Sequence, residues 1–377
     1  MELDHDPLEG THKYKVIREL GRGGMGEVFL AEHVALGSRV VVKLLHAELS
    51  GKSTLVDRMR LEAQALARLN HPNIVRVTDF DRTPSGRPYF VMEYLPGHSL
   101  AEEVDSRGGV LPPVEAIDIV RQALAGLATA HSKGLVHRDI KLDNLFVAET
   151  TSHDGTPARS IKILDFGVAK ILDPTADGPA PLMIPTGTGV VVGTPRFFAP
   201  EQARGQKLDH RADIYAMGLV LYSLIAGRGP FDEAQNITEM AKAHVLTPPQ
   251  PPSRFAPQPI PPDLDAAVLR AIQKRPEDRF QSAPEFSAEL DRIARTPAAP
   301  PAPTQYEAPA IAPAPSASDH TTARLPQQMA PTAPLAPIPP RREPPVVRRY
   351  SAGVVIAVLV VASLLGAAVA AAVMSMA

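Results

Sequence analysis

Four residues near the middle of the chain carry the side chains that phosphoryl transfer requires. Asp139, Lys141 and Asn144 lie on one short stretch, and Asp165 follows after a predicted hairpin. A carboxylate can accept the proton of an attacking hydroxyl, and an ammonium can neutralise charge on the transferred phosphoryl group. An amide oxygen and a second carboxylate are suitable ligands for Mg²⁺. The set predicts phosphoryl transfer from a metal-bound nucleotide.

A glycine-rich stretch near the N-terminus predicts a phosphate-binding turn. It reads Gly21-Arg22-Gly23-Gly24-Met25-Gly26-Glu27-Val28. Glycines let the backbone turn tightly and direct N–H groups at phosphates without obstruction by side chains. A dinucleotide-binding fingerprint has a similar string but opens a helix. Here the flanking runs, residues 14–20 and 27–32, alternate as strands do, so we expect strand, turn and strand.

Two charged residues follow on predicted regular elements. Lys43 lies in a β-branched run at residues 40–45, which predicts a strand. Glu62 lies within residues 53–69, where apolar residues recur at helical spacing. Taken alone, Lys43 would be a solvated lysine on a strand and Glu62 an exposed residue of a helix.

In this order and spacing the segments resemble the protein kinase family. Residues 137–144 are similar to its H-R-D-x-K-x-x-N loop, residues 165–167 to its D-F-G element, and residues 21–28 to its glycine-rich loop. Lysine two residues after Asp139 is the serine/threonine-kinase pattern, and Gly193-Thr194-Pro195 ahead of Ala199-Pro200-Glu201 supports it. Residues 20–28 and 193–202 look particularly like bacterial eukaryotic-like (Hanks-type) serine/threonine kinases. The resemblance extends from Tyr14 to about Ile293.

The resemblance implies an α+β, two-lobed protein-kinase fold. We expect an N-terminal tail at 1–13 and a kinase domain at 14–295, with a β-rich N-lobe (14–95) and a helical C-lobe (96–295). A disordered linker (296–350) and a transmembrane helix (351–375) are expected to follow.

The family's functional residues map onto this chain one by one. Asp139 and Lys141 match the catalytic residues, Asn144 and Asp165 the metal ligands, and Glu62 the ion-pair partner of Lys43. The expected ATP-binding residues are Leu20, Gly21, Arg22, Gly23, Gly24, Met25, Gly26, Glu27, Val28, Lys43, Glu62, Glu93 and Leu95. Glu93 and Leu95 would contact adenine through their main chains, with Met92 behind the base. The implied cofactors are ATP and Mg²⁺, with Mn²⁺ as a substitute.

The resemblance also assigns structural roles to several charged residues. His137 is expected to pack under Phe166 rather than to act as a base. Asp213, which opens a predicted apolar helix, would anchor the backbone of the catalytic loop. Glu201 and Arg279 match a buried salt bridge of the family, in which each charge has a partner.

The segment between Asp165 and Glu201 is long and offers Thr175, Thr186 and Thr188 as phosphorylation sites. Arg138 could pair with a phosphate there and order the loop. The alternative is an unmodified loop. Thr194 is expected to contact Asp139 and Lys141 and so to help position the substrate.

Three positions depart from the family pattern: Val41 replaces an alanine above the adenine, Leu142 replaces a proline, and Phe146 lies where a leucine floors the pocket. Every charged residue of the chemistry is nevertheless present, which favours an active enzyme with protein substrates. The alternative is a membrane-tethered pseudokinase that binds nucleotide without transferring phosphate.

Composition limits the other possibilities. The 377 residues have a net charge of −2, which does not suggest binding to nucleic acid, and contain no cysteine, which excludes disulfides and thiolate sites. The acidic N-terminus lacks the apolar region of a signal peptide. Much of the chain's proline lies in residues 296–347, which with their alanine content predict an extended linker. Its P-x-x-P strings could bind partners, which leaves a docking scaffold as a third interpretation.

The last segment is uncharged and apolar from Ser351 to the C-terminus, and it is longer than the roughly 20 residues that span a bilayer. Arginines precede it at 341, 342, 348 and 349. The positive-inside rule then predicts a single-pass protein of the inner (plasma) membrane with its kinase domain in the cytoplasm and no extracellular sensor. Ala362, Gly366 and Ala370 form a small-residue stripe that would suit a homodimer.

Overall fold

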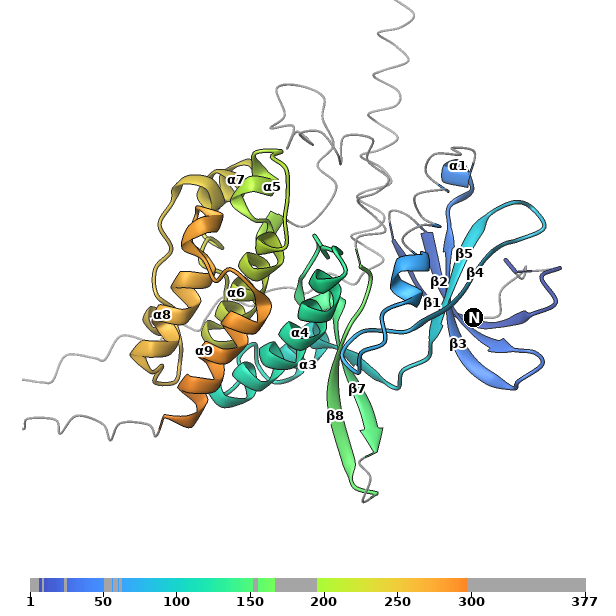
Figure 1. The fold of residues 1–377 in the computed structure, drawn as a ribbon, viewed down its shortest axis with the longest axis horizontal. Coiled ribbons are helices and arrows are strands. Elements are labelled where there is room, and N and C mark those ends of the chain that lie inside the picture. Colours follow the sequence, from blue (N-terminus) through green and yellow to red (C-terminus); the bar gives the residue numbers. More distant parts are fainter. Residues whose placement is uncertain are drawn as a thin grey trace, which may run out of the picture. The chain divides into compact units, whose positions relative to one another are not determined.

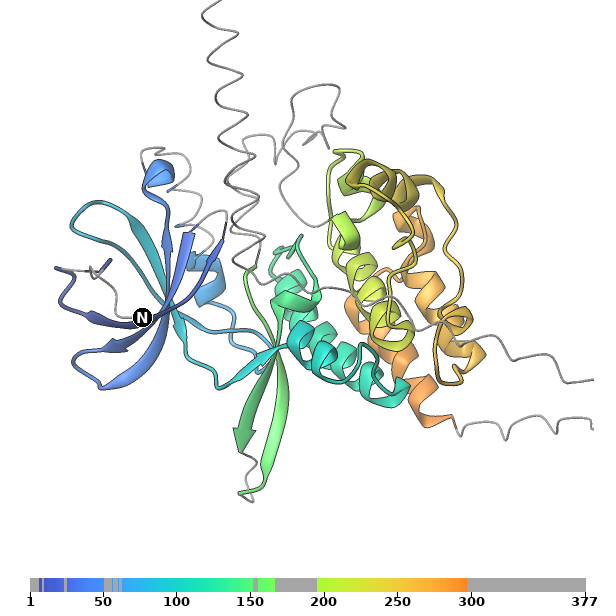
Figure 2. The ribbon, with the colours of Figure 1, turned by 180° about the vertical axis from the view of Figure 1, so that it is seen from behind.

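The computed structural model describes residues 7–8, 10–23, 26–50, 56, 60, 63–151, 155–166 and 195–296. These residues form a strand-rich N-terminal lobe and a largely helical C-terminal lobe (Figures 1 and 2). The two-lobed fold predicted from the sequence is confirmed. Among the helices that the structure describes, none is long and apolar enough to cross a membrane. The predicted span, 351–375, and the predicted linker from residue 297 lie outside the described residues.

The N-terminal lobe is built on a five-stranded antiparallel sheet in the order β1-β2-β3-β5-β4. The strands are β1 (Tyr14–Gly23), β2 (Gly26–His33), β3 (Ser38–Leu45), β5 (Pro88–Glu93) and β4 (Val77–Arg82). β3 contains the β-branched run predicted as a strand, which suits a pleated, half-buried surface. Gly37, with φ of 64°, lies in the β2–β3 turn, a backbone conformation that favours glycine.

The two faces of this sheet pack against different partners. One face carries a cluster of buried residues that includes Phe29, Leu44 and Tyr89. Leu8, from the segment predicted as a tail, is 1% exposed and belongs to the same cluster. The opposite face packs Leu45 and Phe90 against Ala63, which lies in a helical stretch at residues 63–67. Together with residues 56 and 60, which are also helical, that stretch is the described part of the helix predicted at 53–69. The short α1 (Ala47–Ser50) precedes it.

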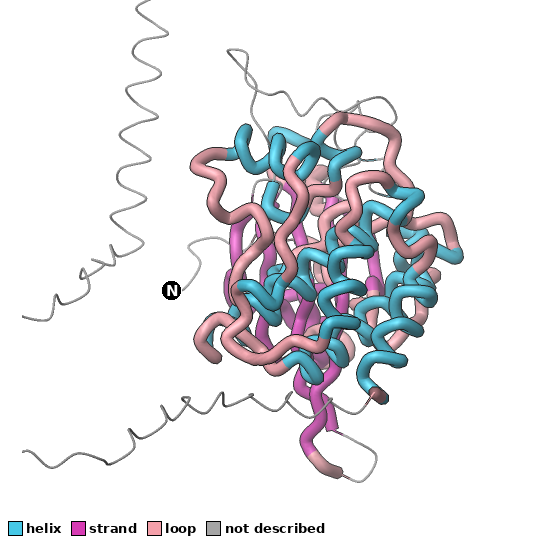
Figure 3. The backbone as a smooth tube through the Cα atoms, turned by 90° about the vertical axis from the view of Figure 1, so that its left-hand side faces the viewer, coloured by secondary structure: helices cyan, strands magenta, loops and turns pink. Residues whose placement is uncertain are grey.

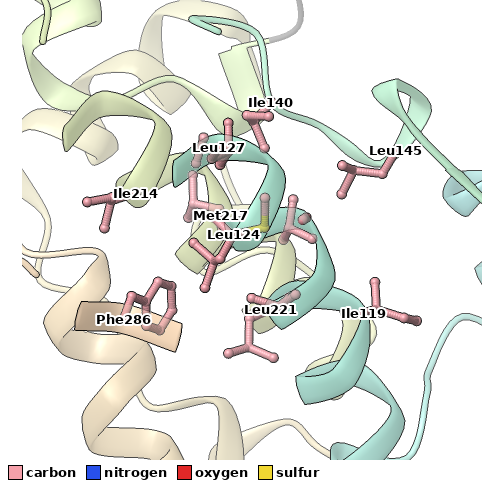
Figure 4. Close-up of a cluster of buried hydrophobic side chains, with 14 of the residues drawn as sticks. Ile119, Leu124, Leu127, Ile140, Leu145, Ile214, Met217, Leu221 and Phe286 are labelled. Atoms are coloured by element: carbon pink, nitrogen blue, oxygen red, sulfur yellow. The ribbon is translucent and has the colours of Figure 1, made fainter. Parts of the chain in front are cut away.

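The core of the C-terminal lobe surrounds α4 (Pro113–Ser132) and α6 (Arg211–Ala226). The helix α4 agrees with the amphipathic helix predicted for Pro112–His131. From Ala212 to Ala226 every residue of α6 is buried, as expected for a helix that is apolar on all sides. Leu124 and Leu127 of α4 face Met217 and Leu221 of α6, and Phe286 lies beside them (Figure 4). The predicted apolar helix around Asp213 is therefore the centre of this lobe.

Shorter elements complete the C-terminal lobe. The remaining helices are α3 (Leu100–Ser106), α5 (Pro200–Ala203), α7 (Ile237–Leu246), α8 (Pro262–Ala271) and α9 (Ala283–Arg295), with 3-10 turns η1 (Leu142–Asn144), η2 (Pro195–Phe197), η3 (Pro252–Arg254) and η4 (Pro276–Asp278). A three-stranded sheet joins β6 (Gly97–Ser99), β7 (Leu145–Thr151) and β8 (Pro157–Ile163). The β7–β8 hairpin projects from the lobe (Figure 3) and carries functional segments at both ends of its base. The loop of the predicted catalytic residues, 137–144, precedes β7, and Asp165 follows β8.

A buried histidine gives the lobe a specific dependence on pH. His244 of α7 is 1% exposed, lies 2.9 Å from the Tyr215 hydroxyl through Nδ1, and packs edge-on against Phe231. Burial, assisted by the Lys274 ammonium, lowers the pKa of His244 to about 3 from an ordinary 6.5. Between those values the unfolded chain binds a proton that the folded chain does not, so the free energy of unfolding falls as the pH falls.

We expect His244→Gln to flatten this dependence between pH 6.5 and 4.5, because the variant no longer takes up this proton on unfolding. The slope of the free energy of unfolding against pH should fall by up to about 1.4 kcal/mol per pH unit. Urea titrations of both proteins across that range measure the slope. The matched control is His12→Gln at an exposed histidine, which measures the effect of replacing a histidine outside the core. An unchanged slope in His244→Gln would show that His244 binds its proton equally in the folded protein and in the unfolded chain, and would contradict the prediction.

Candidate active site

The loop that carries the predicted catalytic residues is held by one buried carboxylate. Asp213, near the start of α6, is 1% exposed and accepts hydrogen bonds of 2.8 Å from the backbone N–H groups of His137 and Arg138. His131 Nε2, from α4, lies 2.8 Å from the same carboxylate. Burial acts to raise the pKa of Asp213, but these hydrogen bonds outweigh it, and the pKa is lowered. The predicted anchoring role of Asp213 is confirmed.

His137 is a structural residue of this loop. It is fully buried, its Nδ1 accepts the Asp139 N–H at 3.2 Å, and its Nε2 lies 2.8 Å from the Leu164 carbonyl oxygen. This pattern assigns the neutral tautomer with the proton on Nε2, and burial lowers the pKa of His137. Its ring centroid lies 4.7 Å from that of Phe166. The predicted packing of His137 against Phe166 is therefore confirmed.

Asp139 and Asn144 are joined directly. The Asn144 amide nitrogen donates to the Asp139 carbonyl at 2.8 Å and to its carboxylate at 3.1 Å. Both bonds use the nitrogen, so the amide oxygen, the atom that ligates hard cations, is used by neither. Lys141 immediately precedes η1 and is half-buried. Asp139, Lys141 and Asn144 therefore lie on one short loop in the structure, as the sequence predicted.

Asp165 lies against Lys43, which comes from the other lobe. Lys43 Nζ is 2.8 Å from Asp165 Oδ2. Burial acts to raise the pKa of Asp165, but attraction to Lys43 outweighs it, so the pKa is lowered and the carboxylate is ionised at neutral pH. Sequence analysis predicted Glu62 as the partner of Lys43; Glu62 lies outside the described residues.

Two residues of this region have backbone conformations that L-amino acids rarely adopt. Arg138 has φ of 64° and Asp165 has φ of 48°. Such a conformation costs roughly 1–2 kcal/mol per residue and persists where the surroundings fix the backbone, often at functional sites. At Arg138, the N–H is bonded to Asp213 and the carbonyl accepts from the Gln202 side chain at 2.9 Å. Sequence reasoning missed the contribution of Gln202.

A small, partly open pocket lies beside the Lys43–Asp165 pair. It is lined by Lys43, Leu66, Val75, Val77, Phe90, Met92, Asp165 and Phe166. Its walls are therefore mostly apolar, with an ion pair at one side. Val41 and Phe146, the two bulkier residues noted in the sequence, do not line this pocket. Phe146 instead lies close to Gly97. A Cβ added to Gly97 would lie 3.0 Å from the Phe146 ring and 2.1 Å from the Val147 carbonyl oxygen.

The segment that joins the lobes contains an ion pair that the sequence did not reveal. Glu93, at the end of β5, lies 2.7 Å from Lys162 Nζ of β8 and accepts the Arg76 N–H at 2.9 Å. Its own N–H donates to the Arg76 carbonyl at 3.0 Å. Lys162 lies between two buried isoleucines of β8, and this alternation predicts a side chain that faces solvent. The Lys162 side chain is nevertheless only 14% exposed. Leu95, the second predicted adenine contact, is half-buried beyond β5.

The two sides of the glycine-rich stretch pair as the predicted strands, while Gly24 and Met25 of the predicted turn lie outside the described residues. Gly21 pairs with Val28, Arg22 with Glu27, and Gly23 with Gly26. A Cβ on Gly26 would lie 2.2 Å from the Leu44 carbonyl oxygen, so β2 can approach β3 only with glycine there. Leu20 precedes the turn and is 39% exposed.

Several predicted site residues lie outside the described residues. They are Gly24, Met25, Glu62, Thr175, Thr186, Thr188 and Thr194. Within the described ranges, no three His, Asp or Glu side chains are grouped as a metal site would require. The predicted ligands are one amide and one carboxylate, which suits Mg²⁺, an ion that proteins usually bind through one or two carboxylates together with substrate phosphates.

Comparison with known proteins identifies the family. A family model described as protein kinase domain matches residues 14–287. The chain belongs to the protein kinase family. Its kinase domain is 42% identical over 283 residues to the serine/threonine-protein kinase Pkn1 of Myxococcus xanthus, covering 74% of this chain and 38% of Pkn1. It is 39% identical to the serine/threonine-protein kinase PknB of Mycobacterium leprae, covering 76% of this chain and 44% of PknB.

A solved structure agrees with this membership. The crystal structure of the Mycobacterium tuberculosis PknI kinase domain superimposes with a TM-score of 0.56 at 29% sequence identity, covering 74% of this chain and 96% of that domain. The chain matches less than half the length of Pkn1 and of PknB. The similarity thus lies in the kinase domain.

Proposed function

We propose that this chain is a serine/threonine protein kinase that transfers the γ-phosphoryl group of Mg-ATP to protein hydroxyls. The observation that carries the proposal is the geometry of one site, in which Asp139 and Asn144 are joined on a loop anchored by Asp213, and Asp165 lies 2.8 Å from Lys43. The sequence similarity to the serine/threonine-protein kinases Pkn1 and PknB supports serine and threonine as the residues that accept the phosphoryl group.

Each residue has a role that follows from its chemistry. Asp139 accepts the proton of the substrate hydroxyl, and Lys141 neutralises charge on the transferred group. Lys43 and the backbone of the glycine-rich hairpin align the phosphates. The main chains of Glu93 and Leu95 hold the adenine edge.

Asn144 and Asp165 hold the metal, Mg²⁺ or Mn²⁺. Their donor atoms fit the ion, since the Asn144 amide oxygen is not used in the bonds to Asp139 and Asp165 is ionised. When bound, the ion supplies charge neutralisation on the phosphates.

Regulation and location are proposed from the sequence. Autophosphorylation at Thr175, Thr186 or Thr188 would place a phosphate within reach of Arg138. Residues 296–350 would form an extended linker, and residues 351–375 would cross the inner membrane, with the kinase domain in the cytoplasm. Alkaline extraction of membranes tests the anchor, since the full chain should remain in the pellet while a chain ending at residue 350 is released. Homodimerisation through Ala362, Gly366 and Ala370 would also be lost from the shortened chain.

A pseudokinase that binds nucleotide is the second candidate, favoured by the bulk of Val41 and Phe146. The two functions differ in one measurement: transfer of labelled γ-phosphate from ATP by the purified full chain with Mg²⁺, beside Asp139→Asn. Label on serine or threonine that is absent from the variant is the expected result. ATP binding without transfer would favour the pseudokinase, and no ATP binding would contradict both candidates.

A further inference from the structure

The glycine-rich hairpin has two faces with different neighbours. On β2, Val28 pairs with Lys43, so these two side chains share the face that carries the ion pair with Asp165. Glu27 pairs with Leu44 on β3 and with Arg22 on β1. Since side chains alternate along a strand, Glu27 and Arg22 lie on the opposite face, with the buried cluster of Leu44. Their side chains therefore face away from the proposed phosphate site.

On that opposite face the Glu27 carboxylate lies between two guanidinium groups. Glu27 Oε1 is 2.6 Å from Arg22, and Oε2 is 2.8 Å from Arg87. The Glu27 side chain is 12% exposed and that of Arg87 is 21% exposed, whereas that of Arg22 is 62% exposed. The inner contact, Glu27–Arg87, is thus the better shielded from water, and Arg22 extends the network to the tip of the hairpin.

Arg87 is itself fixed at its base. Its Nε–H donates to the Leu45 carbonyl at 2.9 Å, two residues beyond Lys43. Its backbone N–H donates to the Thr83 hydroxyl at 3.1 Å, and its carbonyl accepts the Thr83 N–H at 2.8 Å. Thr83 is 5% exposed. Arg87 therefore joins the β4–β5 turn, the end of β3 and the glycine-rich hairpin.

The hairpin tip has few other side-chain contacts among the described residues. A Cβ on Gly21 would meet nothing within 4 Å, and Leu20 is partly exposed. Glycine-rich backbone supplies conformational freedom rather than stiffness. The position of the described part of the hairpin therefore depends on cross-strand hydrogen bonds and on the Arg22–Glu27–Arg87 network, to which Glu19 adds a longer contact of 3.5 Å with Arg22.

We propose that Arg87, acting through Glu27, is a positioning residue that sets the glycine-rich hairpin for nucleotide binding. The inference rests on the proposed function, because it assigns the hairpin to the phosphates of ATP. Loss of Arg87 leaves Glu27 largely buried with a single, exposed partner, and relief comes from rotation of Glu27 toward water. The tip then moves without any change to Lys43, Asp139 or Asp165.

The test compares Arg87→Gln with Arg82→Gln in the full chain. Arg82 lies at the other end of the same β4–β5 turn and is exposed, so its substitution removes an equal charge without touching the network. We expect Arg87→Gln to raise the KM for ATP about 5-fold while kcat changes less than about 2-fold. Hydrogen exchange without nucleotide should become faster in residues 19–28 and remain unchanged in residues 145–163. Arg87→Lys should have a KM for ATP and an exchange rate between those of the parent chain and those of Arg87→Gln. Its ammonium can reach the Glu27 carboxylate or the Leu45 carbonyl, but not both.

Each outcome is decisive. Faster exchange in residues 19–28 together with a raised KM supports the positioning role, provided that Arg82→Gln behaves as the parent chain does. Faster exchange with an unchanged KM would reduce Arg87 to a structural residue and overturn the proposal, as would unchanged exchange. If the parent chain transfers no phosphate, the proposed function fails separately. ATP titration by calorimetry then replaces KM, and the proposal stands only if Arg87→Gln weakens binding.

Discussion

Substitution of Asp165 by asparagine is expected to lower kcat for phosphate transfer by about 10³-fold, because a metal ligand accounts for several kcal/mol of charge stabilisation. The variant keeps the size of the side chain and removes only its charge. Steady-state transfer from labelled ATP measures the loss. Asp143→Asn is the matched control, since Asp143 is an exposed aspartate on η1 and its substitution should leave kcat within about 2-fold.

The fold of Asp165→Asn should remain intact. The Asp165 side chain is 42% exposed, so its ion pair with Lys43 is partly screened by water. Thermal unfolding should therefore change little while transfer is lost. Full activity in Asp165→Asn would show that the metal-ligand assignment is wrong, whereas a large fall in the melting temperature would show that the residue is chiefly structural.

The sequence predicted those parts of the site that depend on neighbours along the chain. The glycine-rich hairpin was predicted from the strand-like alternation of residues on both sides of the glycines, and β1 and β2 pair as expected. Asp139 and Asn144 are five positions apart, so the sequence placed them on one loop, whereas their hydrogen bond at 3.1 Å depends on how that loop folds. Local pattern thus sufficed for the elements and for the short catalytic loop.

Contacts between distant segments needed either the family resemblance or the structure itself. The resemblance supplied the Asp213 anchor, although the two partners are 75 and 76 positions away. Nothing in the local sequence indicates that Lys162 meets Glu93 or that Arg87 meets Glu27, since each pair joins segments that are not neighbouring strands of one sheet. Leu8 is a similar case: it lies in a largely polar segment without apolar periodicity, yet it is buried in the same cluster as Tyr14 and Tyr89.

The largest expected effect on stability is that of Arg279→Met. Arg279 is 1% exposed, and its guanidinium is 2.7 Å from each carboxylate oxygen of Glu201. It also donates to the carbonyls of Gln273, Arg211 and Lys274 at 2.8, 2.9 and 3.1 Å. The predicted Glu201–Arg279 salt bridge is confirmed, and it links the start of α5 to the segment before α9.

Methionine fills much of the same volume but leaves Glu201 charged, 5% exposed and without its partner. Removal of one member of such a pair costs about 3–5 kcal/mol. For a domain of this size that corresponds to a fall in melting temperature of about 10 °C. Differential scanning calorimetry measures it. Arg275→Met, at a side chain that is 70% exposed four residues earlier, should shift the melting temperature by less than about 2 °C.

The double variant Glu201→Gln/Arg279→Met separates the charge from the hydrogen bonds. With Glu201 neutral, the penalty for an unpaired buried carboxylate disappears, so the double variant should be more stable than Arg279→Met alone. The three carbonyls that Arg279 serves remain without their donor in both variants, so recovery should be incomplete. Additive losses would instead show that Glu201 and Arg279 stabilise the lobe independently, through their backbone contacts rather than through each other.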